Sequence, residues 1–212
     1  MENQMDVENY IIKNNIKLLI LDCDGALMDT VESHYLAWRD TYNKLGHEFV
    51  TFNEFQKQYA GTSGFELVGI LNHKFNYTLE IEKTVKLKDD IFITDYIQSV
   101  RPFENVLNLV KQSYGIIPMV VASGGETAVV NEMLNLNKIS KYFVDIITIN
   151  DVKQGKPFPD LFLEASARFN VFPHECLVFE DSNAGFQAAK NANMKCIDVN
   201  ELGNIKNKKK LK

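Results

Sequence analysis

Five short apolar runs rich in Val and Ile are the feature that most limits what this chain can fold into. Helical patterns at 124–137, 159–170 and 182–193 separate the later runs. Alternating strands and helices favour a parallel sheet covered by helices on both faces. The sequence therefore predicts an α/β fold with a Rossmann-like parallel sheet. Its predicted strands are Lys17–Leu21, Met119–Ala122, Asp145–Ile149, Cys176–Phe179 and Lys195–Val199.

The segment from residue 31 to residue 99 breaks this alternation. Its stretches have helical patterns, and no convincing strand pattern interrupts them. We expect a small helical domain inserted after the first strand, with hinges near residues 29–32 and 99–102. The predicted organisation is an α/β core of residues 1–31 and 100–212 and a helical cap of residues 32–99.

Polar residues follow the ends of the predicted strands. Ligands bind beyond the carboxyl ends of the strands in an open parallel sheet, so these residues should meet at one edge. The set contains acids, a lysine, a serine and glycines: Asp22, Asp24, Gly25, Ser123, Gly124, Gly125, Lys156, Glu180 and Asp181.

The charges of this set predict its ligands. Four neighbouring carboxylates repel one another, so either their pKa values rise or a cation neutralises them. Mg²⁺ fits, because it prefers oxygen ligands and commonly takes one or two carboxylates beside phosphate oxygens and water. Ser123, Lys156 and the amides of Gly124 and Gly125 at a predicted helix start form a complementary phosphate cradle. A divalent cation beside an anion cradle indicates phosphoryl transfer.

Four motifs occur in chain order: "DCDGALMDT", "VVAS", "GKPFPD" and "EDSNAG". Together they resemble the motifs of the haloacid dehalogenase superfamily of phosphotransferases, whose first motif is DxDGxxxD followed by Thr or Ser. The resemblance covers essentially the whole chain, and the helical insert resembles the family's mobile cap. It implies a magnesium-dependent enzyme that acts on a small phosphorylated metabolite through an aspartyl-phosphate.

The resemblance assigns roles to the matching residues. It implies that Asp22 is the nucleophile and that Asp24 is the general acid and base. The implied catalytic residues are Asp22, Asp24 and Lys156. The implied phosphate-binding residues are Ser123, Gly124 and Lys156. The implied metal ligands are Asp22, Asp24 through its backbone carbonyl, and Asp181, with Glu180 in the outer shell.

Structural alternatives to these roles stay open. Ser123 can serve as a helix N-cap, and Lys156 can be a solvated loop lysine. Asp29 has either a direct role or a structural hydrogen bond at the hinge. Cys23, between the two acids of the first motif, is expected to be a packed thiol.

The insert must decide the substrate, since the core supplies only generic phosphate chemistry. We predict that His34, Gly61, Thr62 and Ser63 bind substrate, with packing of His34 against Trp38 as the alternative. Such a pattern of Asp-Thr, His and Ala-Trp occurs in beta-phosphoglucomutases and in related sugar phosphatases.

Two departures separate this chain from the beta-phosphoglucomutases. Those mutases usually have Gly-Val-Ser-Arg in the cap loop and Ser-Lys-Asn after the second strand. This chain has Gly-Thr-Ser-Gly at 61–64 and Ser-Gly-Gly at 123–125, and so lacks cations for a second phosphate. It therefore resembles most the fructose-1-phosphate and 6-phosphogluconate phosphatase branch, with beta-phosphoglucomutase as the alternative. Lys57, Lys83 or Lys86 would have to supply the missing charge in a mutase.

The net charge and the composition of the chain limit its possible partners and its cellular location. The net charge is -5, and five lysines lie in the tail "KNKKKLK", which leaves -10 on the rest and argues against nucleic acid as a partner. A solvated terminus is the expectation for this tail. No apolar run approaches the roughly 18 residues that span a membrane. The acidic start lacks a signal pattern and the three cysteines have no paired spacing, so we expect a cytoplasmic monomer with reduced thiols and no membrane partner.

Overall fold

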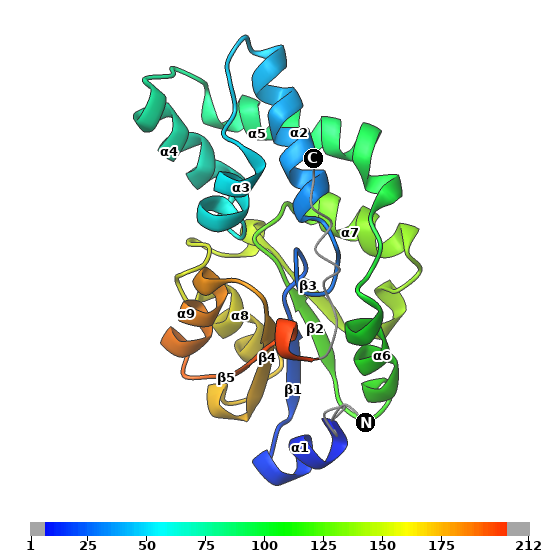
Figure 1. The fold of residues 1–212 in the computed structure, drawn as a ribbon. Coiled ribbons are helices and arrows are strands. Elements are labelled where there is room, and N and C mark those ends of the chain that lie inside the picture. The colour runs from blue at the N-terminus through cyan, green and yellow to red at the C-terminus, as the bar shows by residue number, and fades with distance from the viewer. Residues whose placement is uncertain (1–6, 203–212) are drawn as a thin grey trace.

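The central sheet is the one that the sequence predicts. In the computed structural model, which describes residues 7–202, five parallel strands pair in the order β3-β2-β1-β4-β5 (Figure 1). Each strand starts and ends within one or two residues of its predicted bounds. The strands are β1 (Leu18–Leu21), β2 (Met119–Ala122), β3 (Asp145–Ile147), β4 (Cys176–Glu180) and β5 (Lys195–Asp198).

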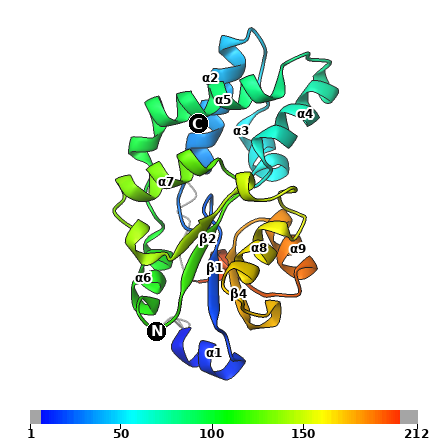
Figure 2. The same cartoon turned by 180° about the vertical axis from the view of Figure 1, so that it is seen from behind.

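Helices cover both faces of this sheet (Figures 1 and 2). They are α6 (Glu104–Ser113), α7 (Thr127–Leu136), α8 (Asp160–Arg168) and α9 (Asn183–Asn191), while α1 (Val7–Asn14) lies at the end of the sheet where β1 begins. Leu19 and Leu21 of β1 pack with residues of α6 and α7, whereas Leu18 and Ile20 pack with residues of α8 and α9. Successive side chains of a strand point to opposite faces, so a strand buried on both faces is apolar throughout.

Two helices outside the insert are absent from the sequence prediction. No helix was predicted at α1 or α6, although α6 buries Val106, Leu109, Val110 and Ser113 at the spacing of one helical face. The predicted left-handed residue after α9 is present, since Asn193 has φ +59°.

The insert contains helices joined by loops and no strand between residues 31 and 99, as predicted. It consists of α2 (Val31–Lys44), α3 (Phe52–Glu54), α4 (Gly64–Phe75), α5 (Ile81–Ile91) and the short helical turns η1 (Phe55–Tyr59), η2 (Phe92–Tyr96) and η3 (Ile97–Ser99). These elements lie beyond the carboxyl ends of the strands (Figure 1). They have an apolar cluster of their own, which includes Trp38, Tyr42, Leu71 and Val85. The division into a core and a mobile cap at the predicted boundaries stays a prediction.

Two connections join the insert to the sheet, and they run side by side. Met28 pairs with Pro102 in an isolated bridge, and the amide of Asp29 donates a hydrogen bond to the carbonyl oxygen of Arg101 at 2.9 Å. Asp29 itself is exposed. Its backbone therefore makes a structural hydrogen bond at this connection.

The remaining sequence expectations concern thiols, membranes and the tail. Cys23, Cys176 and Cys196 are all unpaired thiols, and Cys23 is fully buried, as expected for a packed thiol. Among residues 7–202, no helix is long and apolar enough to cross a membrane. The lysine tail lies outside the described residues.

Candidate active site

The polar residues predicted to meet do lie at the carboxyl edge of the sheet. Asp22 follows β1, Ser123 follows β2 and Glu180 ends β4. The amide of Asp22 donates to the carbonyl oxygen of Phe179, and the amide of Ser123 to that of Ile147, each at 2.9 Å. Hydrogen bonds between neighbouring strands thus bring together residues that are far apart in the sequence.

Three of the acids form a cluster, in which Asp22 and Glu180 are buried and Asp181 is half-buried. Carboxylate oxygens of Asp22, Glu180 and Asp181 lie within 4.8 Å of one another. Burial, and then repulsion from Glu180, raise the pKa of Asp22 well above its usual 3.8, although Lys156 opposes this. Converging carboxylate oxygens are ligands that Mg²⁺ prefers, and a cation would relieve their repulsion. The donor set therefore fits Mg²⁺.

The side chain of Asp181 lies so close to the first motif that position 25 has room only for glycine. Its φ is +89°, a conformation that side chains rarely adopt, and an added Cβ would lie 2.6 Å from Asp181 Oδ2. A larger residue would therefore strain the backbone and push Asp181 out of the acidic cluster.

Lys156 is a buried ammonium group among the acids. It donates hydrogen bonds to Asp22 and Glu180, and its side chain is 3% exposed. Burial lowers the pKa of Lys156, but the charges of the two carboxylates outweigh this and hold the pKa above its usual 10.5. Lys156 is therefore charged at neutral pH and is not a solvated loop lysine.

The carboxylate of Asp24 contacts His34 and Ser123 and not Lys156. Its Oδ1 lies 2.9 Å from Nε2 of His34, and its Oδ2 accepts a hydrogen bond from Ser123 Oγ at 3.0 Å. Burial raises the pKa of Asp24, but the contact with His34 outweighs it and holds the pKa well below its usual value. Burial lowers the pKa of His34, and the charge of Lys88 lowers it further. A carboxylate only accepts, so Nε2 carries the hydrogen in this pair.

The glycine turn after Ser123 differs from its prediction in one respect. Helix α7 begins only at Thr127 with Glu126 as its N-cap, so neither Ser123 nor the two glycines cap or start the helix. Glycine disfavours the helical conformation, which explains the later start. Gly125 donates its amide to Ser123 Oγ at 3.0 Å. A side chain at Gly124 would meet no atom within 4 Å, so this part of the turn borders open space.

Comparison with known proteins identifies the family. Residues 19–199 match the family of haloacid dehalogenase-like hydrolases. The chain belongs to this family. It is 32% identical over 186 residues to the fructose-1-phosphate phosphatase YqaB of Escherichia coli (strain K12), which covers 87% of this chain and 96% of that protein. It is 28% identical over 193 residues to the beta-phosphoglucomutase of Bacillus subtilis (strain 168), and this match covers 88% of this chain and 84% of that protein.

A solved structure shares the fold. The crystal structure of CbbY from Rhodobacter sphaeroides in complex with phosphate matches with a TM-score of 0.78 and 23% identity, over 85% of this chain and 84% of that one. This chain is thus a hydrolase of the haloacid dehalogenase-like family, and phosphatases are among its relatives.

The fourth motif of this hydrolase has a tightly packed geometry. Glu180 Oε2 accepts hydrogen bonds from the amides of Asp181 at 2.7 Å and Ser182 at 2.9 Å. A Cβ added at Gly185 would lie 1.8 Å from Glu180 Oε1. The small residue in "EDSNAG" therefore leaves room for the carboxylate of Glu180 against α9.

The predicted substrate loop of the insert reaches the core at this motif. Gly61 has φ +87°, and an added Cβ would lie 3.0 Å from Ser182 Oγ. Thr62 donates its amide to the carbonyl oxygen of Tyr59 at 3.0 Å, and Ser63 Oγ accepts from the amide of Glu66 at 3.3 Å. The loop thus lies against the site, while substrate binding by Gly61, Thr62 and Ser63 stays a prediction.

Position 64, where the resemblance would place the arginine of the mutases, is closely packed in this chain. A Cβ at Gly64 would meet Trp38 at 3.2 Å and Val85 at 3.3 Å, inside the apolar cluster of the insert. A larger side chain at this position would require Trp38 or Val85 to shift by a few tenths of an ångström.

Two contacts in the insert were missed in the sequence. His34 stacks on Phe92, with ring centroids 4.2 Å apart, and contacts Asp24 directly. Lys88 is 7% exposed, and its Nζ lies 5.1 Å from the Phe92 ring and 5.6 Å from that of Trp38. Lys88 lies four residues after the buried Thr84, so helical spacing offered a signal for its burial.

The lysines considered for the mutase alternative lie elsewhere. Lys57, Lys83 and Lys86 are exposed. Lys83 pairs with Glu80 and Lys86 with Asp90, each at 2.9 Å. None of the three is a buried cation of the insert, whereas Lys88 is.

Proposed function

We propose that this hydrolase is a magnesium-dependent phosphatase of small phosphorylated sugars that works through an aspartyl-phosphate on Asp22. One observation carries the proposal: two complementary sets of groups meet at that carboxylate. Lys156, Ser123 and the open turn at Gly124 are suited to a phosphate. Asp181 joins Asp22 in an oxygen cluster suited to a cation.

Asp22 is the proposed nucleophile, and Lys156 orients it by donating to Oδ1. A carboxylate oxygen of Asp22 attacks phosphorus in line, the bond between phosphorus and the ester oxygen breaks, and the alcohol leaves with a proton from Asp24. Water then attacks the phosphoryl group, Asp24 takes a proton from that water, and inorganic phosphate leaves Asp22.

Both proton transfers require a fixed Asp24. Its two oxygens contact His34 and Ser123, which together orient the carboxylate. The lowered pKa of Asp24 describes the ionised form that the water step needs. A phosphate dianion beside Asp24 would raise that pKa and favour the protonated form that the first step needs.

The proposed Mg²⁺ ligands are Asp22, Asp181 and the backbone carbonyl of Asp24. When bound, the ion offsets the charge that develops on the transferring phosphoryl group. Glu180 has an outer-shell role in this proposal, because Lys156 and two backbone amides already donate to its oxygens.

Release of p-nitrophenol from p-nitrophenyl phosphate tests the reaction and its metal. We expect turnover with Mg²⁺, none in excess EDTA, and recovery when excess Mg²⁺ is returned. Full activity in excess EDTA would contradict the metal assignment. No release under any of these conditions would contradict the phosphatase itself.

The proposed substrates are ketose or aldonate phosphates of the fructose 1-phosphate or 6-phosphogluconate type. A relative that is 32% identical is a fructose-1-phosphate phosphatase, and it is matched over 96% of its length. Gly64 also leaves the loop without a cationic side chain for a second phosphate. A cytoplasmic location and a monomeric state stay predictions.

A mutase is the second candidate, and Lys88 is the observation that favours it. This buried cation of the insert acts electrostatically on Asp24 and His34. It offers a charge that a bisphosphate would need, although it already pairs with Asp89 at 3.0 Å and does not lie at the position of the missing arginine. A coupled assay with beta-glucose 1-phosphate and a bisphosphate primer separates the candidates. We expect phosphate release to exceed glucose 6-phosphate formation, and the opposite result favours the mutase.

A further inference from the structure

The turn that follows Ser123 contains two glycines, so its own sequence does not fix its shape. Glycine adopts more backbone conformations than other residues do. A side chain at Gly124 would meet no atom within 4 Å, so packing does not hold this part of the turn. Donors that stabilise a transferring phosphoryl group must nevertheless stay at fixed positions. Neighbouring segments therefore have to supply the constraint.

Asn150 supplies such a constraint from the short helical turn η5 (Ile149–Asp151), which follows β3. Its Oδ1 accepts a hydrogen bond from the amide of Thr127 at 2.9 Å, and its Nδ2 donates one to Glu126 Oε2 at 2.8 Å. An amide N–H only donates and a carboxylate only accepts, so a single orientation of the carboxamide satisfies both partners. Thr127 is the first residue of α7 and Glu126 is its N-cap. One side chain thus holds both residues at which the glycine turn ends.

Other hydrogen bonds fix η5 to the core. Asp151 Oδ2 accepts from the amide of Thr148 at 2.8 Å, and Asp151 Oδ1 accepts from Arg168 of α8 at 2.6 Å. Thr148 is fully buried, and its Oγ1 lies 2.6 Å from that of Thr127. Asn150 is therefore carried by a segment that is held from α8 and from the start of α7.

The glycine turn is linked in the same way to the reacting groups. Gly125 donates its amide to Ser123 Oγ, and Ser123 Oγ donates to Asp24 Oδ2, each at 3.0 Å. Lys156, the cation of the proposed phosphate site, lies on the same connection between β3 and α8 as Asn150. Asn150 thus joins the two segments that carry the proposed phosphate-binding groups.

We propose that Asn150 is a positioning residue, which fixes the glycine turn at the spacing from Lys156 that a phosphate requires. This proposal rests on the proposed phosphatase function and deepens it. Phosphate is common to all the proposed substrates, so this role does not depend on the leaving group. A displacement of about 1 Å at a reacting site can lower the rate by about 100-fold. A loosened turn is therefore expected to weaken phosphate binding and slow turnover together.

The test measures kcat/KM for p-nitrophenyl phosphate and the inhibition constant of inorganic phosphate, both at saturating Mg²⁺. Asn150 is exposed, so Asn150→Ala leaves no cavity in the core and should fold, which urea unfolding checks. We expect this variant to lower kcat/KM by about 10- to 100-fold and to raise the inhibition constant.

The matched control is Asn137→Ala, at the other end of α7. Asn137 donates its side-chain amide to the carbonyl oxygen of Met133 at 2.9 Å. Its substitution also removes a side-chain hydrogen bond from this helix, but far from the glycine turn. Asn137→Ala should therefore leave both kinetic constants unchanged.

An exchange of the two polar partners gives a second readout. Asn150→Asp should be impaired, because two carboxylates then face each other. In the double variant Asn150→Asp/Glu126→Gln, the carboxamide and the carboxylate change places and the net charge equals that of the wild type. The amide of Thr127 keeps an acceptor, so we expect the double variant to recover most of the lost kcat/KM and phosphate affinity.

Three results would overturn the positioning role while an active wild type leaves the phosphatase intact. They are unchanged kinetic constants in Asn150→Ala, a loss no larger than that in Asn137→Ala, and a double variant no better than Asn150→Asp. A wild type that hydrolyses no phosphate ester would overturn the proposed phosphatase, and this role of Asn150 with it.

Discussion

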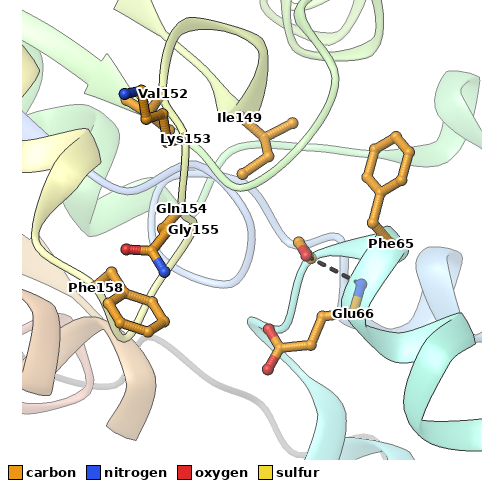
Figure 3. Close-up of a pocket in the computed structure, with 9 residues that line it drawn as sticks. Phe65, Glu66, Ile149, Val152, Lys153, Gln154, Gly155 and Phe158 are labelled. Carbon is orange, nitrogen blue, oxygen red and sulfur yellow. Dashed lines mark hydrogen bonds between the residues drawn. The ribbon is translucent and has the colours of Figure 1, made fainter.

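The buried centre of the proposed site and the boundary between core and insert differ in how completely their polar groups are partnered. On the core side, Asp22, Lys156 and Glu180 are almost unexposed and bonded to one another. At the boundary between core and insert, by contrast, Gln154 of the core and Glu66 of α4 are exposed and have no hydrogen-bond partner within residues 7–202 (Figure 3). Buried polar groups must be satisfied, so the core network has one stable arrangement, whereas the exposed pair can change without disturbing the fold. The reacting groups are therefore expected to be rigid and the boundary between core and insert adjustable.

The largest effect should come from the centre of the buried network. Asp22→Asn removes the proposed nucleophile, so we expect turnover to fall on the order of 10⁴-fold or more, since residues of one catalytic unit fail together. No phosphoryl group should appear on the protein by mass spectrometry after an acid quench. Lys156 keeps Glu180 as a partner, so the fold should persist by circular dichroism.

Asp29→Asn is the control for this substitution, because Asp29 belongs to the same motif but is exposed. It should retain much more turnover than Asp22→Asn. Near-normal turnover in Asp22→Asn would show that the nucleophile is misassigned.

The next largest effect should appear in stability. Lys156→Met leaves Asp22 and Glu180 buried without their shared cation, and removing one partner of a buried ion pair costs about 3–5 kcal/mol. Urea unfolding in the absence of Mg²⁺ measures this loss. Lys153→Met, on the same connection but exposed, should change the free energy of unfolding by less than about 0.5 kcal/mol. Equal stability of the two variants would show that the pairing of Lys156 does not support the fold.

The core side of the site was predictable because its residues follow strands. Once a parallel sheet is inferred, Asp22, Ser123 and Glu180 must come to one edge, whichever order the strands take. Lys156 was predicted in the same way, since it lies in the connection after the third predicted strand, and the motif "GKPFPD" supported it. The helices α1 and α6 were missed for a different reason. The helical spacing of α6 is present in the sequence, but the helix begins after Phe103, which offers no side-chain cap to mark its start.

The contacts of the insert were not predictable in the same way. His34 reaches Asp24 only because α2 and η2 pack together and bring Phe92 against its ring. The opposed positions of Glu66 and Gln154 depend on how α4 lies over a connection of the core (Figure 3). Such contacts depend on the relative position of two helices or of two layers, which no local pattern encodes.

The smallest expected effect is a difference in stability between alanine substitutions at two helical glycines, one on each side of the site. Gly185 in α9 leaves no space, since an added Cβ would lie 1.8 Å from Glu180 Oε1. Lys156 and two backbone amides hold that carboxylate, so it cannot move aside without losing hydrogen bonds. We expect Gly185→Ala to cost about 1–3 kcal/mol of stability by overpacking and to slow turnover as well. Gly69 in α4 has no atom within 4 Å of an added Cβ, so Gly69→Ala should stabilise by about 0.5–1 kcal/mol through helix propensity. Urea unfolding of both variants measures the difference. If Gly185→Ala were as stable as Gly69→Ala, the carboxylate of Glu180 could adopt another position. The core side of the site would then tolerate substitution as well as the insert does.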